Sequence, residues 1–188
     1  NDPMALFYCP DISTACILPE EESQHAAKVL RLQAGDSIIV IDGKGGYYEA
    51  EITRPHHKRC EFRIVKATQN FGKRNYRLHI AIAPTKNIER IEWFIEKATE
   101  IGIDEITPLL CRFSERKNVK DERLEKIIVS AAKQSKKAYF PVLNPLTPFD
   151  QFIKTAKAEN RYIAHCYERD KKHLSTELKG QKDILVLI

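Results

Sequence analysis

Two cations near the start of a predicted helix are the first candidates for chemistry. Lys86 and Arg90 flank the first turn of NIERIEWFIEKATEIG, residues 87–102. The helix dipole is positive at this end, so a cation here costs roughly a few tenths of a kcal/mol or more. A residue that works against its own local element is a candidate for function. The structural alternative is that Glu89 and Glu92 neutralise the pair.

Other cations are grouped along the chain in a way that suits nucleic acid. The groups are RPHHKR (54–59), FGKRNYR (71–77), RFSERKNVK (112–120) and KQSKK (133–137). His25 lies beside Lys28 and Arg31 on a predicted helix, where an exposed polar face and an RNA contact are equally good interpretations. The net charge of +5 is compatible with RNA, but solubility alone explains such an excess about as often.

Motifs for several other chemistries are absent from the sequence. Neither glycine-rich phosphate loop occurs, and there is no G-x-S-x-G or H-E-x-x-H. His56 and His57 are adjacent and would point apart on a strand, which makes them an improbable metal pair. The five cysteines are scattered without a C-x-x-C, so we expect reduced thiols and no metal.

The elements that must position these residues fall into two parts. Residues 1–72 alternate apolar and polar side chains with period two, which predicts a small β-barrel. Its predicted inward positions are Ile38, Val40, Tyr48, Ala50 and Ile52. One helix interrupts the strands in LPEEESQHAAKVLRLQAGD, with an expected apolar stripe of Ala26, Val29 and Leu30.

Residues 73–188 instead alternate strands with helices, which predicts a mostly parallel sheet covered by helices. The predicted strands are 77–83, 105–110, 141–145, 161–166 and 183–188, and the predicted helices are 87–102, 121–138 and 147–159. Gly102 would end the first helix, and Thr147 would cap the third. On the first helix Glu92, Glu96 and Glu100 form a stripe, for which we favour pairing with cations, for example Arg116, over catalysis.

The last six residues, DILVLI, read as a buried central strand: an acid followed by five aliphatic residues. Ligands of open α/β sheets bind beyond the carboxyl ends of the strands. We therefore expect the loop that binds the ligand to follow Ile188, so that the sequence is truncated in the functional sense. The alternative, a terminal edge strand, would leave an apolar edge open to aggregation.

Four stretches in this order resemble the RsmE family of the SPOUT superfamily, the bacterial 16S ribosomal RNA uracil-N3 methyltransferases. They are HAAKVLRLQAGDSIIVIDGKG (25–45), APTKNIERIEWFIEKATEIGIDEITPLLCRFSERKNV (83–119), ERLEKIIVSAAKQSKK (122–137) and the terminal LVLI. The resemblance covers essentially the whole chain. Its specificity lies in the combination of V-L-R-x-x-x-G-D, K-A-T-E-x-G-x-x-x-I-x-P and S-E-R.

The resemblance implies an α/β protein with a PUA-like RNA-binding barrel in residues 1–72 and a SPOUT methyltransferase domain in residues 73–188. The latter would bind S-adenosyl-L-methionine and form a trefoil knot. In the family a strand like LVLI runs into a G-P-E-G loop, and a later L-R-x-E-T segment completes the knot; neither is present here. The family often has Gly-Arg where this chain has Lys136 and Lys137, which keeps charge but loses the planar guanidinium.

The implied reaction is methyl transfer from S-adenosylmethionine to N3 of a uridine in 16S ribosomal RNA of the small subunit. Because N3 loses a proton, cations should stabilise the developing anion, and we assign Lys86, Arg90 and Arg116 to that role. For RNA binding we nominate His25, Lys28, Arg31, Arg54, Lys58, Arg59 and Arg112. For the cofactor we nominate His165, Cys166, Leu187 and Ile188, largely through backbone groups. A homodimer is typical of SPOUT enzymes, and Trp93 is either a dimer contact or partly buried in the core.

Two other functions remain open. One is a non-catalytic RNA-binding protein of the same architecture, and the other is a Rossmann-like nucleotide enzyme, against which the missing glycine fingerprint argues. No apolar stretch approaches the roughly 18 residues that cross a bilayer, and the first residues are not a secretory signal. We therefore expect a cytoplasmic protein with no membrane partner.

Overall fold

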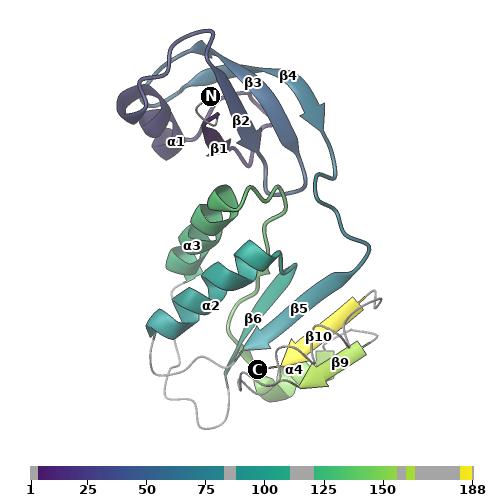
Figure 1. The fold of residues 1–188 in the computed structure, drawn as a ribbon. Coiled ribbons are helices and arrows are strands. Elements are labelled where there is room, and N and C mark those ends of the chain that lie inside the picture. Colours follow the sequence, from purple (N-terminus) through teal and green to yellow (C-terminus); the bar gives the residue numbers. More distant parts are fainter. Residues whose placement is uncertain (1–3, 83–87, 111–120, 156–159, 164–182, 188) are drawn as a thin grey trace. The chain divides into compact units, whose positions relative to one another are not determined.

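The computed structural model describes residues 4–82, 88–110, 121–155, 160–163 and 183–187 (Figure 1). It divides into two compact units. The first unit combines Asn1–Lys73 with Ala132–Phe140, and the second combines Arg74–Ala131 with Pro141–Ile188. Residues 132–140 thus pack with the first unit, although the sequence pattern there continues a helix of the second.

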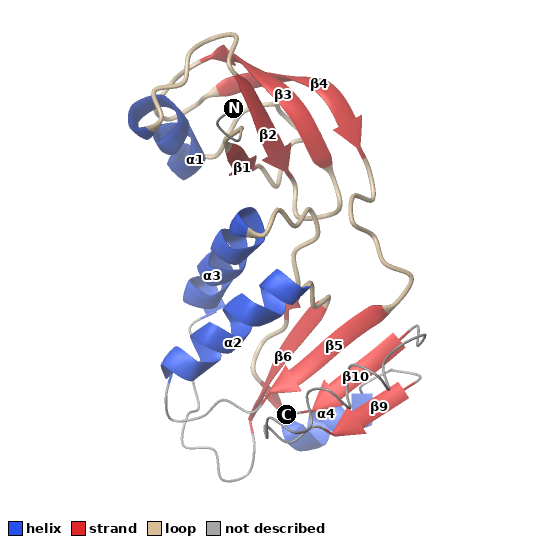
Figure 2. Ribbon diagram, in the orientation of Figure 1, coloured by secondary structure: helices blue, strands red, loops and turns tan. Residues whose placement is uncertain are grey.

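The first unit contains a four-stranded sheet in the order β1-β2-β3-β4 (Figure 2). The strands are β1 (Leu6–Tyr8), β2 (Ser37–Ile41), β3 (Tyr47–Arg54) and β4 (Glu61–Thr68). β1 runs parallel to β2, and the other pairs are antiparallel. The predicted inward positions are confirmed, because Ile38, Val40, Tyr48, Ala50 and Ile52 all lie in one buried cluster.

The helix of this unit differs from the predicted one. α1 (Glu20–Gln24) continues into a π-helical turn, η1 (His25–Val29), in which the Leu30 N–H donates to the His25 carbonyl at 2.9 Å. This wider turn breaks the 3.6-residue period on which the stripe prediction relied. Ala26 is fully buried, but Val29 is 67% and Leu30 42% exposed. The predicted apolar stripe is therefore wrong at its last two positions.

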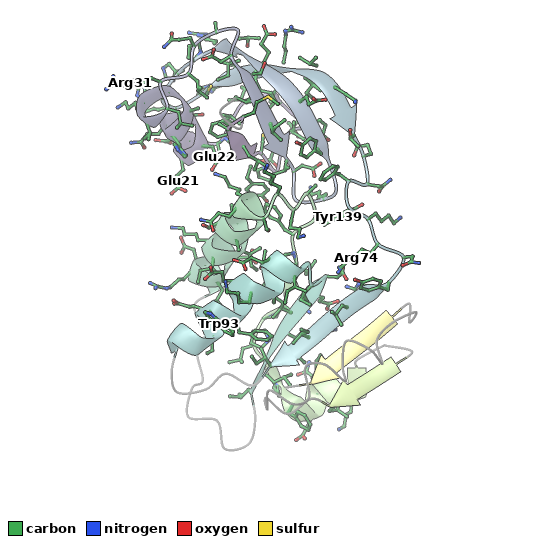
Figure 3. The ribbon with its side chains drawn as sticks, viewed as in Figure 1. Glu21, Glu22, Arg31, Arg74, Trp93 and Tyr139 are labelled. Carbon is green, nitrogen blue, oxygen red and sulfur yellow. The ribbon has the colours of Figure 1, made fainter. Side chains whose placement is uncertain are left out.

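Glu22 anchors α1 to the rest of the unit. One of its carboxylate oxygens accepts the Tyr8 N–H at 3.0 Å, and the other lies 2.7 Å from the Lys133 ammonium (Figure 3). Ser23 is fully buried, and its hydroxyl donates to the Leu18 carbonyl and accepts the Cys60 N–H. These bonds hold the helix against the sheet in one orientation.

The turn between β2 and β3 packs against residues 138–140. The Gly45 N–H donates to the Ala138 carbonyl at 3.0 Å, and the Tyr139 hydroxyl donates to the Asn70 side chain at 2.9 Å. Gly45 has φ +96°, and a Cβ placed there would overlap the Tyr139 ring. The turn therefore needs glycine both for its backbone conformation and for space.

The second unit contains a parallel sheet in the order β7-β6-β5-β10-β9, and a short β8 also pairs with β6. The strands are β5 (Arg77–Ile82), β6 (Glu105–Leu110), β7 (Val142–Leu143), β8 (Thr147–Pro148), β9 (Asn160–Ile163) and β10 (Asp183–Leu187). The helices are α2 (Ile88–Ile101), α3 (Asp121–Gln134) and α4 (Phe149–Thr155). The predicted alternation of strands with helices is confirmed.

β10 is an interior strand and not an edge strand, as its aliphatic run predicts. It pairs in parallel with β5 on one side and with β9 on the other. Leu187, its last residue, is in register with Ala81 and Ile163. The alternative of an exposed edge strand is thereby excluded for Asp183–Leu187.

The predicted end of α2 is confirmed, but the predicted cap of α4 is wrong. Gly102 has φ +96° and its N–H donates to the Ala98 carbonyl, so it ends α2 as predicted. Thr147 is not a helix cap. It pairs with Leu109, and its hydroxyl donates to the Pro145 carbonyl, so α4 begins only at Phe149.

The Gly45 turn can be tested with two matched glycine variants. Gly35 has φ +94° and would meet nothing within 4 Å of an added Cβ. We expect Gly35→Ala to lower the free energy of unfolding by about 1–2 kcal/mol through backbone strain. Gly45→Ala should cost about 1–3 kcal/mol more, because the methyl group also displaces Tyr139.

Urea unfolding of both variants measures the difference, and adding Tyr139→Ala to Gly45→Ala should recover part of it. Equal destabilisation by the two glycine variants would contradict the proposed role of Tyr139.

Candidate functional site

The carboxyl edge of the parallel sheet is the natural binding edge of the second unit. β5, β10 and β9 end there at Ile82, Leu187 and Ile163, and α2 starts after β5. Leu187 therefore lies at the carboxyl end of the interior strand β10, where the sequence placed a cofactor contact. His165, Cys166 and Ile188 lie outside the described residues.

Of the proposed cations of this unit, the structure places one on a described element. α2 begins at Ile88, so Arg90 lies in its first turn on the carboxyl side of β5. Lys86, Arg112 and Arg116 lie outside the described residues. The topology thus brings the Arg90 backbone and the end of β10 to the same edge, while the roles of all four cations stay predictions.

Two arginines of the basic cluster 71–77 are ion-paired. Arg74 Nη2 lies 2.9 Å from Asp104 Oδ2 and also donates to the Gly102 carbonyl (Figure 3). The same Asp104 oxygen accepts the Leu78 N–H at 2.7 Å. Arg77 pairs with Glu105. These contacts tie the start of β5 to the turn before β6, so the two arginines serve the fold.

A polar network missed by the sequence reasoning joins the middle of β5 and β6 to the residue that follows β7. His79 Nε2 lies 2.7 Å from Thr107 Oγ1, and Asn144 Nδ2 donates to the same oxygen at 2.9 Å. His79 also lies 3.7 Å from Glu105, and both side chains are largely buried. The available signal was a histidine and a threonine on adjacent apolar strands. We interpret this network as a structural cross-link, because it lies away from the carboxyl edge.

A depression of about 420 Å³ lies on the described surface of α2 and α3. It is lined by Glu92, Trp93, Glu96, Arg123, Lys126, Ile127 and Ser130. Trp93 is 58% exposed, so the prediction that its ring is partly buried in the core is not supported. Glu92 pairs with Arg123, and this hydrogen bond raises the pKa of the guanidinium. The predicted pairing of the acidic stripe with cations is thus confirmed for Glu92, and the suggested partner Arg116 lies outside the described residues.

On the first unit, the π-helical turn brings exposed cations to one end of the helix. Lys28 and Arg31 are exposed, and Arg31 has φ +52° (Figure 3). Loss of hydration, and then the nearby Lys28 charge, lower the pKa of His57. Lys28 at the helix end therefore lies near His57, and the RNA-binding roles of these residues stay predictions.

The other nominated residues of the first unit occupy separate positions. His25 is exposed at the start of the π turn, and Arg54 is exposed at the end of β3. Lys58 and Arg59 are held by their backbone N–H groups, which donate to His56 Nδ1 at 3.0 and 3.2 Å. The structure brings Lys28 near His57 of the 56–59 loop, whereas Arg54 lies at the end of β3, in register with Glu61.

The two adjacent histidines do not point apart. They lie in a bend instead of a strand, and their rings stack with centroids 4.6 Å apart. Across the described residues, no group of three His, Cys, Asp or Glu side chains could hold a metal ion. In the same part of the chain, no helix is long and apolar enough to cross a membrane.

Comparison with known proteins identifies both units. The RNA methyltransferase domain family matches residues 72–188, and the RNA methyltransferase PUA domain family matches residues 18–65. The architecture is thus a PUA-like domain followed by a parallel-sheet α/β domain.

Two curated relatives are named ribosomal RNA small subunit methyltransferase E. The protein from Synechocystis sp. is 30% identical over 84% of this chain and 52% of its own length. The protein from Rickettsia conorii is 25% identical over 84% of this chain and 63% of its own length. This chain therefore spans between half and two thirds of these relatives.

Solved structures agree with this assignment. A probable rRNA-methyltransferase from Porphyromonas gingivalis is 39% identical and matches with a TM-score of 0.83, covering 98% of this chain and 79% of that one. A methyltransferase structure from Legionella pneumophila with bound SAM is 26% identical, with a TM-score of 0.78, covering 99% of this chain and 79% of that one.

The structural role of Arg74 can be separated from a role in binding. Arg74→Ala should lower the free energy of unfolding by about 1–3 kcal/mol, because Asp104 and the Gly102 carbonyl lose a charged donor. Arg123→Ala is the control from the same unit: its side chain is 65% exposed, so its pair with Glu92 is screened by water and should contribute little to stability. Thermal and urea unfolding measure both. A stability loss no larger for Arg74→Ala than for Arg123→Ala would refute the structural role of Arg74.

Proposed function

The chain belongs to the RNA methyltransferase family, and from this premise we propose that it methylates ribosomal RNA. The substrate is N3 of a uridine in 16S RNA of the small subunit, and the methyl donor is S-adenosyl-L-methionine. The observation that carries the proposal is the interior position of β10, whose carboxyl end lies at the binding edge of a parallel sheet. The curated relatives named as small subunit methyltransferases support the choice of RNA.

We propose that the cofactor binds at this edge largely through backbone groups. The last residue of β10 pairs on both sides, so its position is fixed at the carboxyl edge. Leu187 and Ile188, with His165 and Cys166 after β9, would hold the donor there. When bound, S-adenosylmethionine supplies an activated methyl carbon on a sulfonium.

The protein's own contribution is to hold the uracil and to stabilise charge. Transfer would break the N3–H bond and the sulfur–methyl bond of the donor and form the N3–methyl bond; the proton passes to a nearby basic group or water, and the sulfur leaves as a neutral thioether. Negative charge develops on the uracil, and Lys86, Arg90 and Arg116 would stabilise it. Because the pairing edge of the uracil must be free, the target nucleotide is unpaired or flipped.

The PUA-like domain and the α/β domain have different proposed roles. We assign RNA binding to residues 1–72 through His25, Lys28, Arg31, Arg54, Lys58 and Arg59, and the methyl donor to residues 73–188, with Arg112 as a further RNA contact. Both the trefoil knot and a cytoplasmic location stay predictions. A non-catalytic RNA-binding protein remains the alternative, and the methylation experiment below separates it from the enzyme.

A homodimer is part of the proposal, with the α2–α3 depression as its contact. Trp93 is exposed there between an acidic and a basic set of side chains. A surface that carries both charges can pair with its own copy about a two-fold axis. A second copy of the chain is therefore the proposed occupant of this face.

Methyl transfer can be tested on the purified natural protein with unmodified 16S RNA or small subunits. We expect labelled methyl groups from S-adenosylmethionine to appear as N3-methyluridine after nuclease digestion and mass spectrometry. RNA binding without methylation would favour the non-catalytic alternative. Methylation at another atom would refute the N3 assignment.

Arg90→Ala tests the charge role without threatening the fold. A cation in the first turn opposes the helix dipole, so its removal should not destabilise α2. We expect kcat to fall by about 10²- to 10³-fold with little change in melting temperature. Arg63→Ala, which removes an exposed arginine paired with Glu51, is the matched control and should keep full activity. Equal activities of the two variants would remove Arg90 from the site.

Dimerisation can be followed by sedimentation and by fluorescence, since Trp93 is the single tryptophan. Dimer formation should shift its emission to shorter wavelength as concentration rises. Trp93→Ser should weaken the dimer by at least about tenfold. Phe149→Ser, which removes an exposed aromatic ring from α4, should not change it. A Trp93→Ser variant that still dimerises fully would place the interface elsewhere.

A further inference from the structure

The π-helical turn of the first unit exposes two apolar side chains that the sequence pattern would bury. Val29 is 67% and Leu30 42% exposed at the end of η1. In η1 the Leu30 N–H donates to the His25 carbonyl, and after it the Leu32 N–H donates to the Ala26 carbonyl. This wider hydrogen-bond spacing turns Val29 and Leu30 away from the buried side of the helix. π turns within helices occur frequently at functional sites.

Positive charge surrounds this apolar pair. Lys28 precedes Val29, and Arg31 follows Leu30 in a left-handed backbone conformation that is rare outside glycine. Figure 3 shows Arg31 at the free end of the helix, directed away from the sheet. Lys28 is also close enough to His57 to disfavour its protonation. The surface is thus a small apolar centre flanked by cations.

The shape of this surface is held by contacts on the opposite side of the helix. Ala26 is fully buried, and Ser23 bonds both Leu18 and Cys60. Glu22 bonds the Tyr8 backbone and Lys133. None of these contacts uses Val29 or Leu30, so the exposed pair is available to a partner without rearrangement of the unit.

We propose that Val29 and Leu30 contact the face of an unpaired nucleobase while Lys28 and Arg31 bind the flanking phosphates. This inference rests on the proposed RNA methyltransferase function. It adds a contact to a nucleobase in the first unit, whose other proposed contacts are to the RNA backbone. It names a site distinct from the uridine that is methylated.

The chemistry of the surface favours single-stranded RNA over other partners. Duplex RNA presents phosphates and 2′-hydroxyls and hides the base faces, so an apolar pair would gain little from it. An unpaired base offers an apolar face within reach of two phosphates, which matches an apolar centre with cations on both sides. Aliphatic side chains are also used to wedge between bases in other nucleic acid complexes.

A second exposed valine provides the matched control. Val65 on β4 of the same unit is 60% exposed and also lies among cations. The neighbouring Arg63, however, is paired with Glu51 at 2.8 Å. Val65 lies at a β-bulge, where the pairing with β3 shifts from Lys66 to Ile64, but it has no π turn and no residue of positive φ beside it.

The test measures binding of two labelled RNAs to the purified natural protein. One is a short single-stranded RNA of mixed sequence, and the other is the same chain with its central nucleotides abasic, so that phosphates remain and bases are absent. We expect the unmodified protein to bind the first RNA more tightly. Val29→Ser combined with Leu30→Ser should weaken binding to the first RNA about 5- to 50-fold and leave binding to the abasic RNA unchanged.

Further variants separate apolar contact from charge. Leu30→Met keeps an apolar side chain and should retain the preference for bases, whereas Val65→Ser should behave as the unmodified protein. Lys28→Ala and Arg31→Ala should weaken binding to both RNAs and make the salt dependence shallower, by about 0.7 in the logarithmic slope for each lost phosphate contact.

Three results would overturn the inference. The first is that the Val29→Ser/Leu30→Ser and Val65→Ser variants weaken RNA binding equally. The second is that the Val29→Ser/Leu30→Ser variant loses as much affinity for the abasic RNA as for the RNA with bases. The third is that this variant loses as much affinity for duplex RNA as for single-stranded RNA. If the protein binds none of these RNAs, the proposed function fails with the inference. Methyl transfer that persists together with any of the three results would overturn the base contact alone.

Discussion

The two-sided pairing of β10 is the constraint on which the second unit depends. β5 and β9 are far apart in sequence and do not pair with each other. β10 lies between them and pairs in parallel with both. This insertion aligns the ends of the three strands at one edge and places the start of α2 beside them in the chain. Without β10, the sheet would separate into two parts, and the proposed cofactor edge would not exist. The functional proposal therefore depends first on a backbone arrangement and only then on particular side chains.

Cations in this protein fall into two groups with different uses. Arg74 and Arg77 hold the start of β5 through Asp104 and Glu105, and Lys133 holds α1 through Glu22. Lys28 and Arg31, by contrast, are exposed at the end of a helix whose hydrogen-bond register exposes them. A basic cluster in the sequence thus does not by itself indicate a binding surface, because burial and acidic partners decide which charges remain available for phosphate.

The sequence predicted those features that follow from local composition. The unbroken aliphatic run of residues 184–188 predicted an interior strand because a strand covered by helices on both faces reads as a continuous apolar run, and Gly102 predicted the end of α2 because it adopts positive φ. The π turn was missed, since its register is set by tertiary bonds such as Ser23 to Cys60. The pairing of Glu92 with Arg123, and the His79 network, equally required knowledge of which elements are neighbours. For the candidate site, the topology was predictable, but Lys86, Arg112, Arg116, His165 and Cys166 lie outside the described residues, and their roles rest on the resemblance to the family.

Backbone amide hydrogen exchange of the natural protein, measured with and without S-adenosylmethionine, tests the central claim most directly. If β10 is paired on both sides, Asp183–Leu187 should exchange as slowly as β5 and far more slowly than β4, the last strand of the other sheet. The cofactor should slow exchange further at the carboxyl end of β10 and leave β4 unchanged. Fast exchange of Asp183–Leu187, or protection by the cofactor that appears only in the first unit, would contradict both the sheet order and the binding edge proposed from it.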